Sequence, residues 1–342
     1  MLFTFERYVI RAGTRYLRRC FSNDVEVSAN NLQEFTPQSN KNFTLVRRED
    51  QKSLKIAFLG APNVGKSTIV NQLIKRSICP VSSKVHTTQT KANGIYCEAN
   101  TQLIFMDTPG MISPTEFKRY KLASSFRTDP KTSLKAADII GIVQDAENIY
   151  TRHKIHPIIL ELLTKNIRNT IPIILVINKV DRVKKKEILL DLVNTLTKSK
   201  LSPDFYDIFM ISALTGDGVD DLRTYLLDSA KPRAWEYEEH IYSDKTCEDI
   251  IQQTVRAKLM DSLPNEIPYQ LQVKLEHFDP GPDDNIKALL SITCPTPRIA
   301  RLLMRGKTKT KKISQIARMA EEELRHAFRT SVILRLHIQS KT

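Results

Sequence analysis

Residues 54–74 read LKIAFLGAPNVGKSTIVNQLI. The first six residues are an apolar run typical of a buried strand, and the last seven have the spacing of a helix that faces a core. Between them stands a complete GxxxxGKS phosphate loop, in the strand-turn-helix context that this motif requires. Gly60 and Gly65 allow backbone N–H groups to converge on phosphates at the positive end of the helix. We therefore expect a nucleotide site on a sheet covered by helices.

The side chains of this loop predict phosphate and metal contacts. Lys66 is expected to reach the β and γ phosphates, and the Ser67 hydroxyl is expected to bind Mg²⁺. The nucleotide-binding residues expected from this loop are Gly60, Ala61, Pro62, Asn63, Val64, Gly65, Lys66, Ser67 and Thr68.

Two further strand ends predict a pocket for guanine. The apolar run 173–177 ends in Asn178-Lys179-Val180-Asp181, where the Asp181 carboxylate can accept hydrogen bonds from two guanine donors and Lys179 can lie over the ring. The run 208–211 ends in Ser212-Ala213-Leu214, whose backbone is expected to contact guanine O6. An ATP-using enzyme such as a kinase is excluded, because the Asn-Lys-Val-Asp segment has no function with adenine.

Two other segments are expected to sense the γ-phosphate. The strand 103–106 ends in Asp107-Thr108-Pro109-Gly110, where Asp107 can hold Mg²⁺ through water and the Gly110 N–H can contact the phosphate. Thr87 and Thr88 lie in a polar loop before the strand 94–98, where a threonine can sense both the phosphate and the metal. The predicted metal set is Ser67, Thr88 and Asp107.

The order of these elements predicts an α/β fold, namely a P-loop doubly wound and mostly parallel sheet. Because the carboxyl ends of parallel strands share one edge, the loops above should meet there. Helices are expected near 116–135, 154–165, 184–198 and 218–228.

A second domain is expected after Pro232. Its pattern is a helix at 245–263, strands at 270–276 and 286–292, helices at 297–304 and 313–328, and a strand at 332–338. This helix-strand-strand-helix-helix-strand order is that of a type II KH α+β domain, a fold that grips single-stranded nucleic acid. The predicted domain boundaries are 53–232 for the nucleotide domain and 233–342 for the KH-like domain.

The motifs at 60–67, 82–88, 107–110 and 212–218 together resemble the Era family of GTPases, over roughly residues 54–230. The resemblance implies GTP hydrolysis to GDP, a carboxy-terminal KH domain, and binding of small-subunit ribosomal RNA near its 3′ end during assembly of that subunit. Met111 stands where a glutamine would orient water, so the resemblance also implies a potassium ion held partly by Asn63. The expected catalytic residues are Lys66, Asn63, Thr88 and Gly110.

The segment between the two middle KH helices departs from the GXXG pattern of KH domains. It has Gly306 in the first glycine position and Lys309 in the second. From 298 to 329 there are ten basic and three acidic residues, so direct charge contact with phosphate can replace close backbone approach. The alternative is a degenerate domain that docks on protein, with ribosome or membrane contacts in place of RNA. The expected RNA-binding residues are Arg305, Gly306, Lys307, Lys309, Lys311 and Lys312.

The net charge of the chain indicates the kind of partner, and the amino-terminal residues indicate the location of the protein in the cell. The chain has 52 basic and 38 acidic residues, a net charge of +14 that favours a polyanionic partner.

Residues 1–22 carry five arginines against one acid among apolar residues, which is typical of a mitochondrial transit peptide. A disordered basic arm that touches nucleic acid is the alternative for these residues. Residues 23–52 are expected to be a polar linker. We expect a monomer in the mitochondrial matrix that associates with the small ribosomal subunit, with a peripheral contact to the inner membrane.

Overall fold

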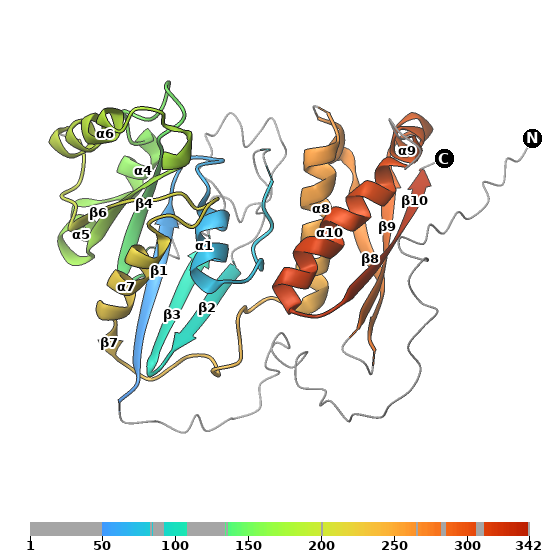
Figure 1. The fold of residues 1–342 in the computed structure, drawn as a ribbon, viewed down its shortest axis with the longest axis horizontal. Coiled ribbons are helices and arrows are strands. Elements are labelled where there is room, and N and C mark those ends of the chain that lie inside the picture. Colours follow the sequence, from blue (N-terminus) through green and yellow to red (C-terminus); the bar gives the residue numbers. More distant parts are fainter. Residues whose placement is uncertain are drawn as a thin grey trace, which may run out of the picture. The chain divides into compact units, whose positions relative to one another are not determined.

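The computed structural model of the 342-residue chain contains two compact units (Figure 1). The described residues are 50–82, 84, 92–107, 134, 136–199, 201–264, 266–281, 285–305 and 311–340. The first unit ends at Lys245 and the second begins at Thr246. The expected transit peptide, most of the expected linker and nearly all of the helix expected near 116–135 lie outside the described residues.

The first unit is built on a seven-stranded sheet with the order β2-β3-β1-β4-β5-β6, to which β7 adds beside β1. The five strands β1, β3, β4, β5 and β6 are parallel, whereas β2 and β7 run antiparallel to their neighbours. This confirms the predicted doubly wound, mostly parallel sheet. The strands are β1 (Lys52–Leu59), β2 (Ala92–Glu98), β3 (Thr101–Asp107), β4 (Ile139–Asp145), β5 (Ile173–Asn178), β6 (Asp207–Met210) and β7 (Lys231–Pro232).

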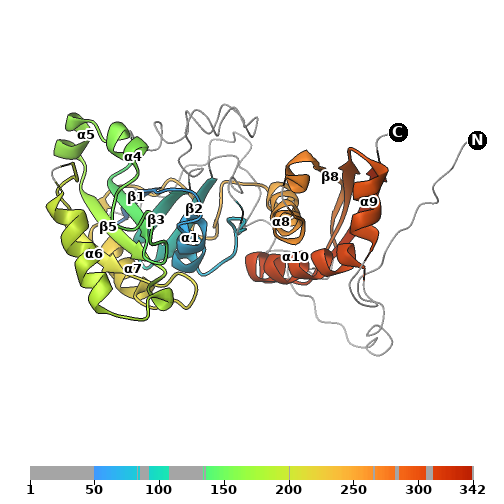
Figure 2. The ribbon, with the colours of Figure 1, turned by 90° about the horizontal axis from the view of Figure 1, so that it is seen from above.

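Helices pack on this sheet because its central strands are apolar on both faces. All residues of β4 and β5 are buried. Helices α1 (Lys66–Ile74) and α7 (Val219–Asp228) contact each other and β3. Helices α4 (Pro157–Leu162) and α6 (Glu187–Lys198) bury apolar side chains in a core shared with β1, β4 and β5. Figure 2 shows these helices around the sheet from above.

Two elements differ from the sequence-based expectation. The strand β4 was not among the predicted strands. The single helix expected at 154–165 is wrong, because two short helices occupy the region, α4 and α5 (Lys165–Thr170). The chain leaves the helical conformation at Leu163, and the Thr164 hydroxyl then accepts a hydrogen bond from the Ile167 N–H to begin α5.

The segment 233–245 packs on the first unit, so the second unit begins at Thr246 rather than at residue 233. The Trp235 indole N–H donates to the carbonyls of Lys52 and Asn100, each at 3.1 Å. The Gln102 side chain accepts from the Glu236 and Tyr237 N–H groups. Further along, the Ile95 N–H donates to the Tyr242 carbonyl, so this segment extends the edge of β2. These bonds join segments more than a hundred residues apart in the sequence, which is why local patterns did not indicate them.

An ion pair at the start of this segment predicts a pH-dependent stability. Burial alone would raise the pKa of the Asp138 carboxyl, but two hydrogen bonds from Arg233 and one from the Lys55 N–H hold this pKa below its ordinary value. Asp138 therefore stabilises the fold above its unfolded-state pKa of 3.8, and the stabilisation is lost as pH falls through the lower folded-state pKa. Asp138→Asn is expected to lower the free energy of unfolding by about 1–3 kcal/mol at pH 7.

The fluorescence of Trp235, the only tryptophan in the chain, reports this unfolding. The difference between the native and Asp138→Asn proteins should shrink on acidification to about pH 3. Asp204→Asn, at an exposed position in the loop before β6, serves as the control. A pH-independent difference would contradict the ion-pair explanation.

The second unit has the predicted helix-strand-strand-helix-helix-strand order. Its three strands have the order β10-β9-β8, with β10 parallel and β8 antiparallel to β9. This mixed sheet agrees with the predicted type II KH domain and confirms the fold class. The elements are α8 (Cys247–Ser262), β8 (Gln272–Pro280), β9 (Ile286–Cys294), α9 (Pro297–Met304), α10 (Lys312–Phe328) and β10 (Val332–Ser340).

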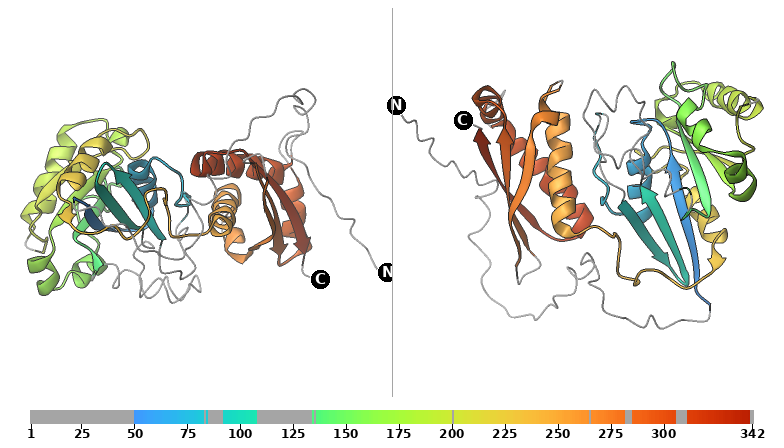
Figure 3. Two further views of the ribbon diagram at one scale, coloured as in Figure 1. Left: turned by 90° about the horizontal axis from the view of Figure 1, so that it is seen from below. Right: turned by 180° about the vertical axis from the view of Figure 1, so that it is seen from behind.

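The helices α8 and α10 contact each other and the sheet of the second unit (Figure 3). Along β10, Val332, Leu334 and Leu336 are buried, whereas Arg335 is exposed on the opposite face. The buried Glu321 of α10 accepts a hydrogen bond from the Leu334 N–H at 2.9 Å, which satisfies a donor of this edge strand. No helix among the described residues is long and apolar enough to cross a membrane.

Candidate nucleotide site and candidate RNA interface

The phosphate loop between β1 and α1 has the backbone that the sequence predicted. Gly65 has φ +97°, and a Cβ there would lie 2.3 Å from Nδ2 of Asn178. A Cβ at Gly60 would lie 2.9 Å from the Val143 carbonyl oxygen. Both positions therefore require glycine. Within the described residues no side chain caps the amino terminus of α1, which leaves its first-turn N–H groups suited to an anionic ligand.

The Lys66 ammonium lies over this loop. It donates to the carbonyl oxygens of Gly60 and Ala61, each at 3.1 Å, and the side chain is buried. Ser67 and Thr68 follow in the first turn of α1, where they are half-buried. Asn63 is exposed and has φ +61°, a conformation that asparagine adopts more readily than most residues.

The buried Asn178 side chain joins three loops. Its Nδ2 donates to the Val64 carbonyl at 2.8 Å, and its Oδ1 accepts from the Ala213 N–H at 3.0 Å. The phosphate loop, the end of β5 and the loop after β6 are thus held together at the carboxyl edge of the sheet. The loops that the sequence assigned to phosphate and to base are brought into one site.

Asp181 and Lys179 are held by partners that the sequence did not indicate. The Ser212 hydroxyl donates to Oδ1 of Asp181 at 2.6 Å, which orients the carboxylate. The Lys179 ammonium lies 2.6 Å from Oδ2 of Asp145 and 3.8 Å from Oε2 of Glu147. Sequence reasoning missed both acids, because Asp145 ends β4 and Glu147 follows it, and this strand was not predicted. An apolar run before Asp145 was the signal that could have located it.

The remaining predicted nucleotide contacts fall partly outside the described residues. Asp107 is the last residue of β3, and Leu214, in the loop after β6, is 67% exposed. Among the described residues no group of three or more His, Cys, Asp or Glu side chains could hold a metal ion. Residues that lie outside the described ranges are Thr87, Thr88, Thr108, Pro109 and Gly110.

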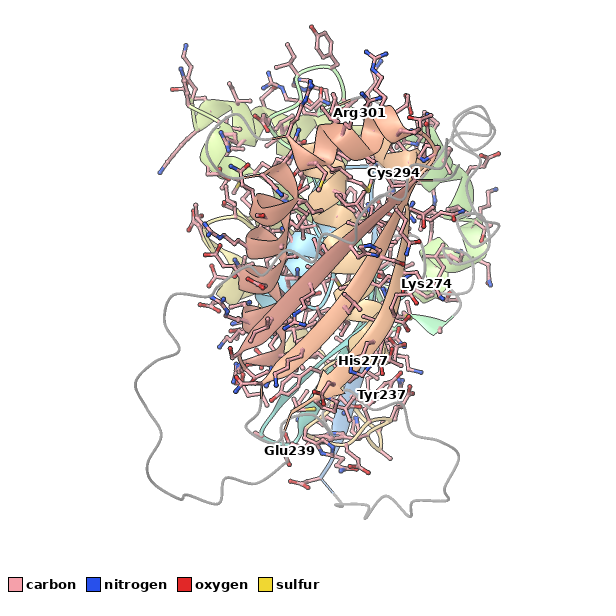
Figure 4. All side chains as sticks on the ribbon, turned by 90° about the vertical axis from the view of Figure 1, so that its right-hand side faces the viewer. Tyr237, Glu239, Lys274, His277, Cys294 and Arg301 are labelled. Atoms are coloured by element: carbon pink, nitrogen blue, oxygen red, sulfur yellow. The ribbon has the colours of Figure 1, made fainter. Side chains whose placement is uncertain are left out.

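The candidate RNA interface lies where α9 passes into α10. The Lys312 N–H donates to the Arg305 carbonyl at 3.2 Å, so the two ends of the turn are close together. Arg305 and Lys311 are exposed, and so is Arg301 on α9, which Figure 4 labels. Gly306, Lys307 and Lys309 lie outside the described residues.

The fold and the three assembled loops define a P-loop protein of the guanine-nucleotide class. A family model described as a 50S ribosome-binding GTPase matches residues 55–179. The chain is 32% identical over 305 residues to the mitochondrial GTPase Era of Danio rerio, covering 72% of this chain and 68% of that protein. It is 34% identical over 265 residues to GTPase Era of Mesorhizobium japonicum, covering 77% and 81%.

A solved structure is similar over both units. It is a crystal structure of Era in complex with MgGDPNP and nucleotides 1506–1542 of 16S ribosomal RNA, with a TM-score of 0.71 and 27% identity. The similarity covers 85% of this chain and 94% of that chain. The chain belongs to the Era family, and it is a GTPase.

Proposed function

We propose that this GTPase acts in mitochondria, where it binds small-subunit ribosomal RNA through its second unit and times a step in assembly of the small subunit. The proposal rests on the presence of two features in one chain. The first unit has an assembled nucleotide site, and the second unit has exposed cations, Arg305 and Lys311, between α9 and α10. Two relatives support it, the mitochondrial Era of Danio rerio and the Era crystallised with 16S ribosomal RNA.

Crosslinking of the chain in isolated mitochondria, followed by sequencing of bound RNA, tests this proposal. The expected product is small-subunit ribosomal RNA near its 3′ end. A variant with Lys309→Glu and Lys311→Glu gives the background level. Recovery of other RNAs alone, or recovery equal to that background, would contradict the proposal.

The location and domain boundaries belong to the same proposal. Residues 1–22 act as a transit peptide to the matrix, and the residues from 23 to the start of β1 at Lys52 act as a linker. The GTPase domain is followed by the RNA-binding domain, and the protein is a monomer that touches the inner membrane peripherally. Edman sequencing of the mature protein from mitochondria should find an amino terminus near residue 22.

The phosphate loop fits a nucleotide with Mg²⁺. The uncapped first turn of α1 offers N–H donors to the phosphates, and Lys66 offers a cation. Ser67, Thr88 and Asp107 are the residues that would hold the ion, since hydroxyl and carboxylate oxygens are the protein ligands that Mg²⁺ prefers. When bound, Mg²⁺ neutralises charge on the β and γ phosphates. Thr88 and Gly110 sense the γ-phosphate.

The base is read by the loops that Asn178 joins. Asp181 accepts from the guanine N–H donors, Lys179 lies along the ring, and the 212–214 backbone contacts O6. The hydrogen bond from Ser212 and the ion pair with Asp145 hold the two reading side chains before nucleotide arrives.

Potassium is expected to accelerate GTP hydrolysis. Asn63 is exposed in the phosphate loop, and an amide side chain contains a carbonyl oxygen, the kind of ligand that suits a hard monovalent cation. A potassium ion there supplies positive charge near the transferring phosphate. Turnover in potassium should exceed turnover in equal sodium by about tenfold or more. Equal turnover in potassium and sodium would show that potassium does not take part in hydrolysis. An Asn63→Ala enzyme that keeps its potassium response would show that Asn63 does not hold the ion.

Charge reversal at the turn is expected to weaken RNA binding. Lys309→Glu with Lys311→Glu removes two phosphate contacts, so the slope of log affinity against log salt should become shallower by about 1.4, or 0.7 per contact. The measurement is binding of a 3′-terminal small-subunit ribosomal RNA oligonucleotide by the full chain at several salt concentrations.

Lys287→Glu with Arg335→Glu is the matched control, because both residues are exposed on the strands β9 and β10 and the change in net charge is the same. Equal behaviour of the two double variants would favour the alternative function, in which the second unit docks on protein.

A further inference from the structure

The loops that follow β4 and β5 form an exposed basic surface next to the base-reading residues. The β4 loop carries Tyr150, Arg152 and Lys154, and the segment before α6 carries three consecutive lysines. We call this set the basic ridge, and it consists of Tyr150, Arg152, Lys154, Lys184, Lys185 and Lys186.

Several contacts hold the two loops side by side. The Ala146 N–H donates to the Asn178 carbonyl at 3.0 Å, and β4 pairs with β5 from Ile140 to Asp145. The His153 ring lies 3.9 Å from the Asp191 carboxylate of α6. Within the β4 loop, the Gln144 amide donates to the Thr151 and Lys154 carbonyls. The ridge is therefore a built surface in which both loops keep their places.

Three of the acids near the ridge face other groups. Asp145 and Glu147 face the Lys179 ammonium, and Asp191 faces His153, whereas Glu187 directly follows Lys186 and is exposed. Lys184, Lys185 and Lys186 are exposed, and no described residue forms an ion pair with any of them. Positive charge is thus left facing solvent on a chain whose net charge is +14.

An exposed aromatic side chain lies in the same loop as Arg152 and Lys154. Tyr150 is 90% exposed, an unusual state for a large ring that has apolar area to bury. A basic surface that also carries an exposed aromatic side chain suits single-stranded nucleic acid, since lysines contact phosphates and rings stack on bases. We propose that the basic ridge binds single-stranded RNA, with Tyr150 stacking on a base and the lysines on the backbone.

A membrane is the less favoured occupant. Within 147–156, all of which is described, the large apolar residues that are prominently exposed are Ile149 and Tyr150. Insertion into a bilayer interface requires a broader apolar face than these two side chains offer. This proposal rests on the proposed function only in the choice of RNA as the ligand. It does not require RNA binding by the second unit, since the ridge and the α9–α10 turn are on different units.

The test measures binding of a fluorescent single-stranded RNA by the full chain, in a background that carries Lys309→Glu and Lys311→Glu. Lys184→Glu with Lys185→Glu should lower affinity by about tenfold or more and make the salt slope shallower by about 1.4. Tyr150→Ala should lower affinity about fivefold or more with the slope unchanged. Lys165→Glu with Lys198→Glu is the matched control, at exposed positions on α5 and at the far end of α6.

The outcomes separate the ridge from the turn. Ridge variants that bind like the matched control overturn the proposal, whatever the turn variants do. Ridge variants that weaken RNA binding uphold it, even where the turn variants bind RNA normally and the proposed role of the second unit fails. A parallel assay uses sedimentation with phosphatidylcholine–cardiolipin vesicles. Loss of vesicle binding with unchanged RNA binding in the ridge variants would make the ridge a membrane contact and overturn the proposal.

Discussion

Replacing Asp181 with asparagine is expected to turn the preference of the site from GTP to xanthosine triphosphate. The carboxylate presents only acceptors to the base, and the hydrogen bond from Ser212 fixes its orientation. Asparagine presents an amide N–H to the guanine donors, which then lose their acceptor, whereas xanthine offers a carbonyl to that amide. Each unpaired donor in a closed site costs about 1–3 kcal/mol, so GTP affinity should fall about 10²- to 10⁴-fold.

Displacement of a fluorescent guanine nucleotide by GTP, XTP and ATP measures this change. Asp217→Asn is the control, because Asp217 lies in the neighbouring loop, is exposed, and carries the same carboxylate. A variant that still prefers GTP over XTP would show that Asp181 does not read the base. ATP should compete poorly with both proteins, since adenine lacks the donors that Asp181 accepts from.

The parts of the site that the sequence predicted are those written in short contiguous motifs. The phosphate loop needs two glycines, a lysine and a serine within eight residues, and its backbone strain is local. The Asn178 and Ser212 segments could be placed because each follows an apolar strand, and parallel strands end at the same edge. The sequence therefore located the phosphate loop and the two candidate base-reading loops at one edge of the sheet, and their contacts with nucleotide stay predictions.

The parts that the sequence could not predict are contacts between those loops. The hydrogen bond from Asn178 to Val64 joins residues 114 apart, and no local pattern encodes it. The ion pair of Lys179 with Asp145 depends on β4 lying next to β5, which is a property of the sheet order. These contacts set how rigidly the predicted nucleotide-contacting side chains are held. They therefore affect how tightly the site binds a nucleotide more than which nucleotide it binds.

Contacts between distant segments also explain why the boundary between the two units differs from the predicted one. Proline and a change in pattern after residue 232 suggested a new domain there, yet 233–245 is bound to the first unit. Its partners are Gln102, Asn93 and the β2 backbone, which lie far away in the sequence. A fragment that begins at residue 246 should fold with fewer exposed apolar side chains than one that begins at 233, because Trp235 and Ile241 are buried against the first unit.

Replacing Lys66 with alanine is expected to abolish binding of GTP and GDP. The ammonium is buried over the loop that receives the phosphates, and removing a buried cation from beside an anion costs about 3–5 kcal/mol, or roughly 10²- to 10⁴-fold in affinity. The loop also loses the donor that bridges the Gly60 and Ala61 carbonyls. The variant should therefore show weak nucleotide affinity and no measurable GTP hydrolysis.

Thermal unfolding with and without GDP separates the loss of nucleotide binding from the loss of the hydrogen bonds within the loop. A ligand at a hundred times its dissociation constant stabilises the folded state by about 2.7 kcal/mol, so the native protein should unfold at a higher temperature with GDP. The Lys66→Ala protein should gain almost nothing from GDP, and its unfolding temperature without nucleotide gives the loss of stability caused by the missing donor. Lys75→Gln removes an exposed lysine just after the same helix and should keep the full response to GDP. A Lys66→Ala protein that GDP still stabilises as strongly would show that the phosphates are held by the loop backbone alone.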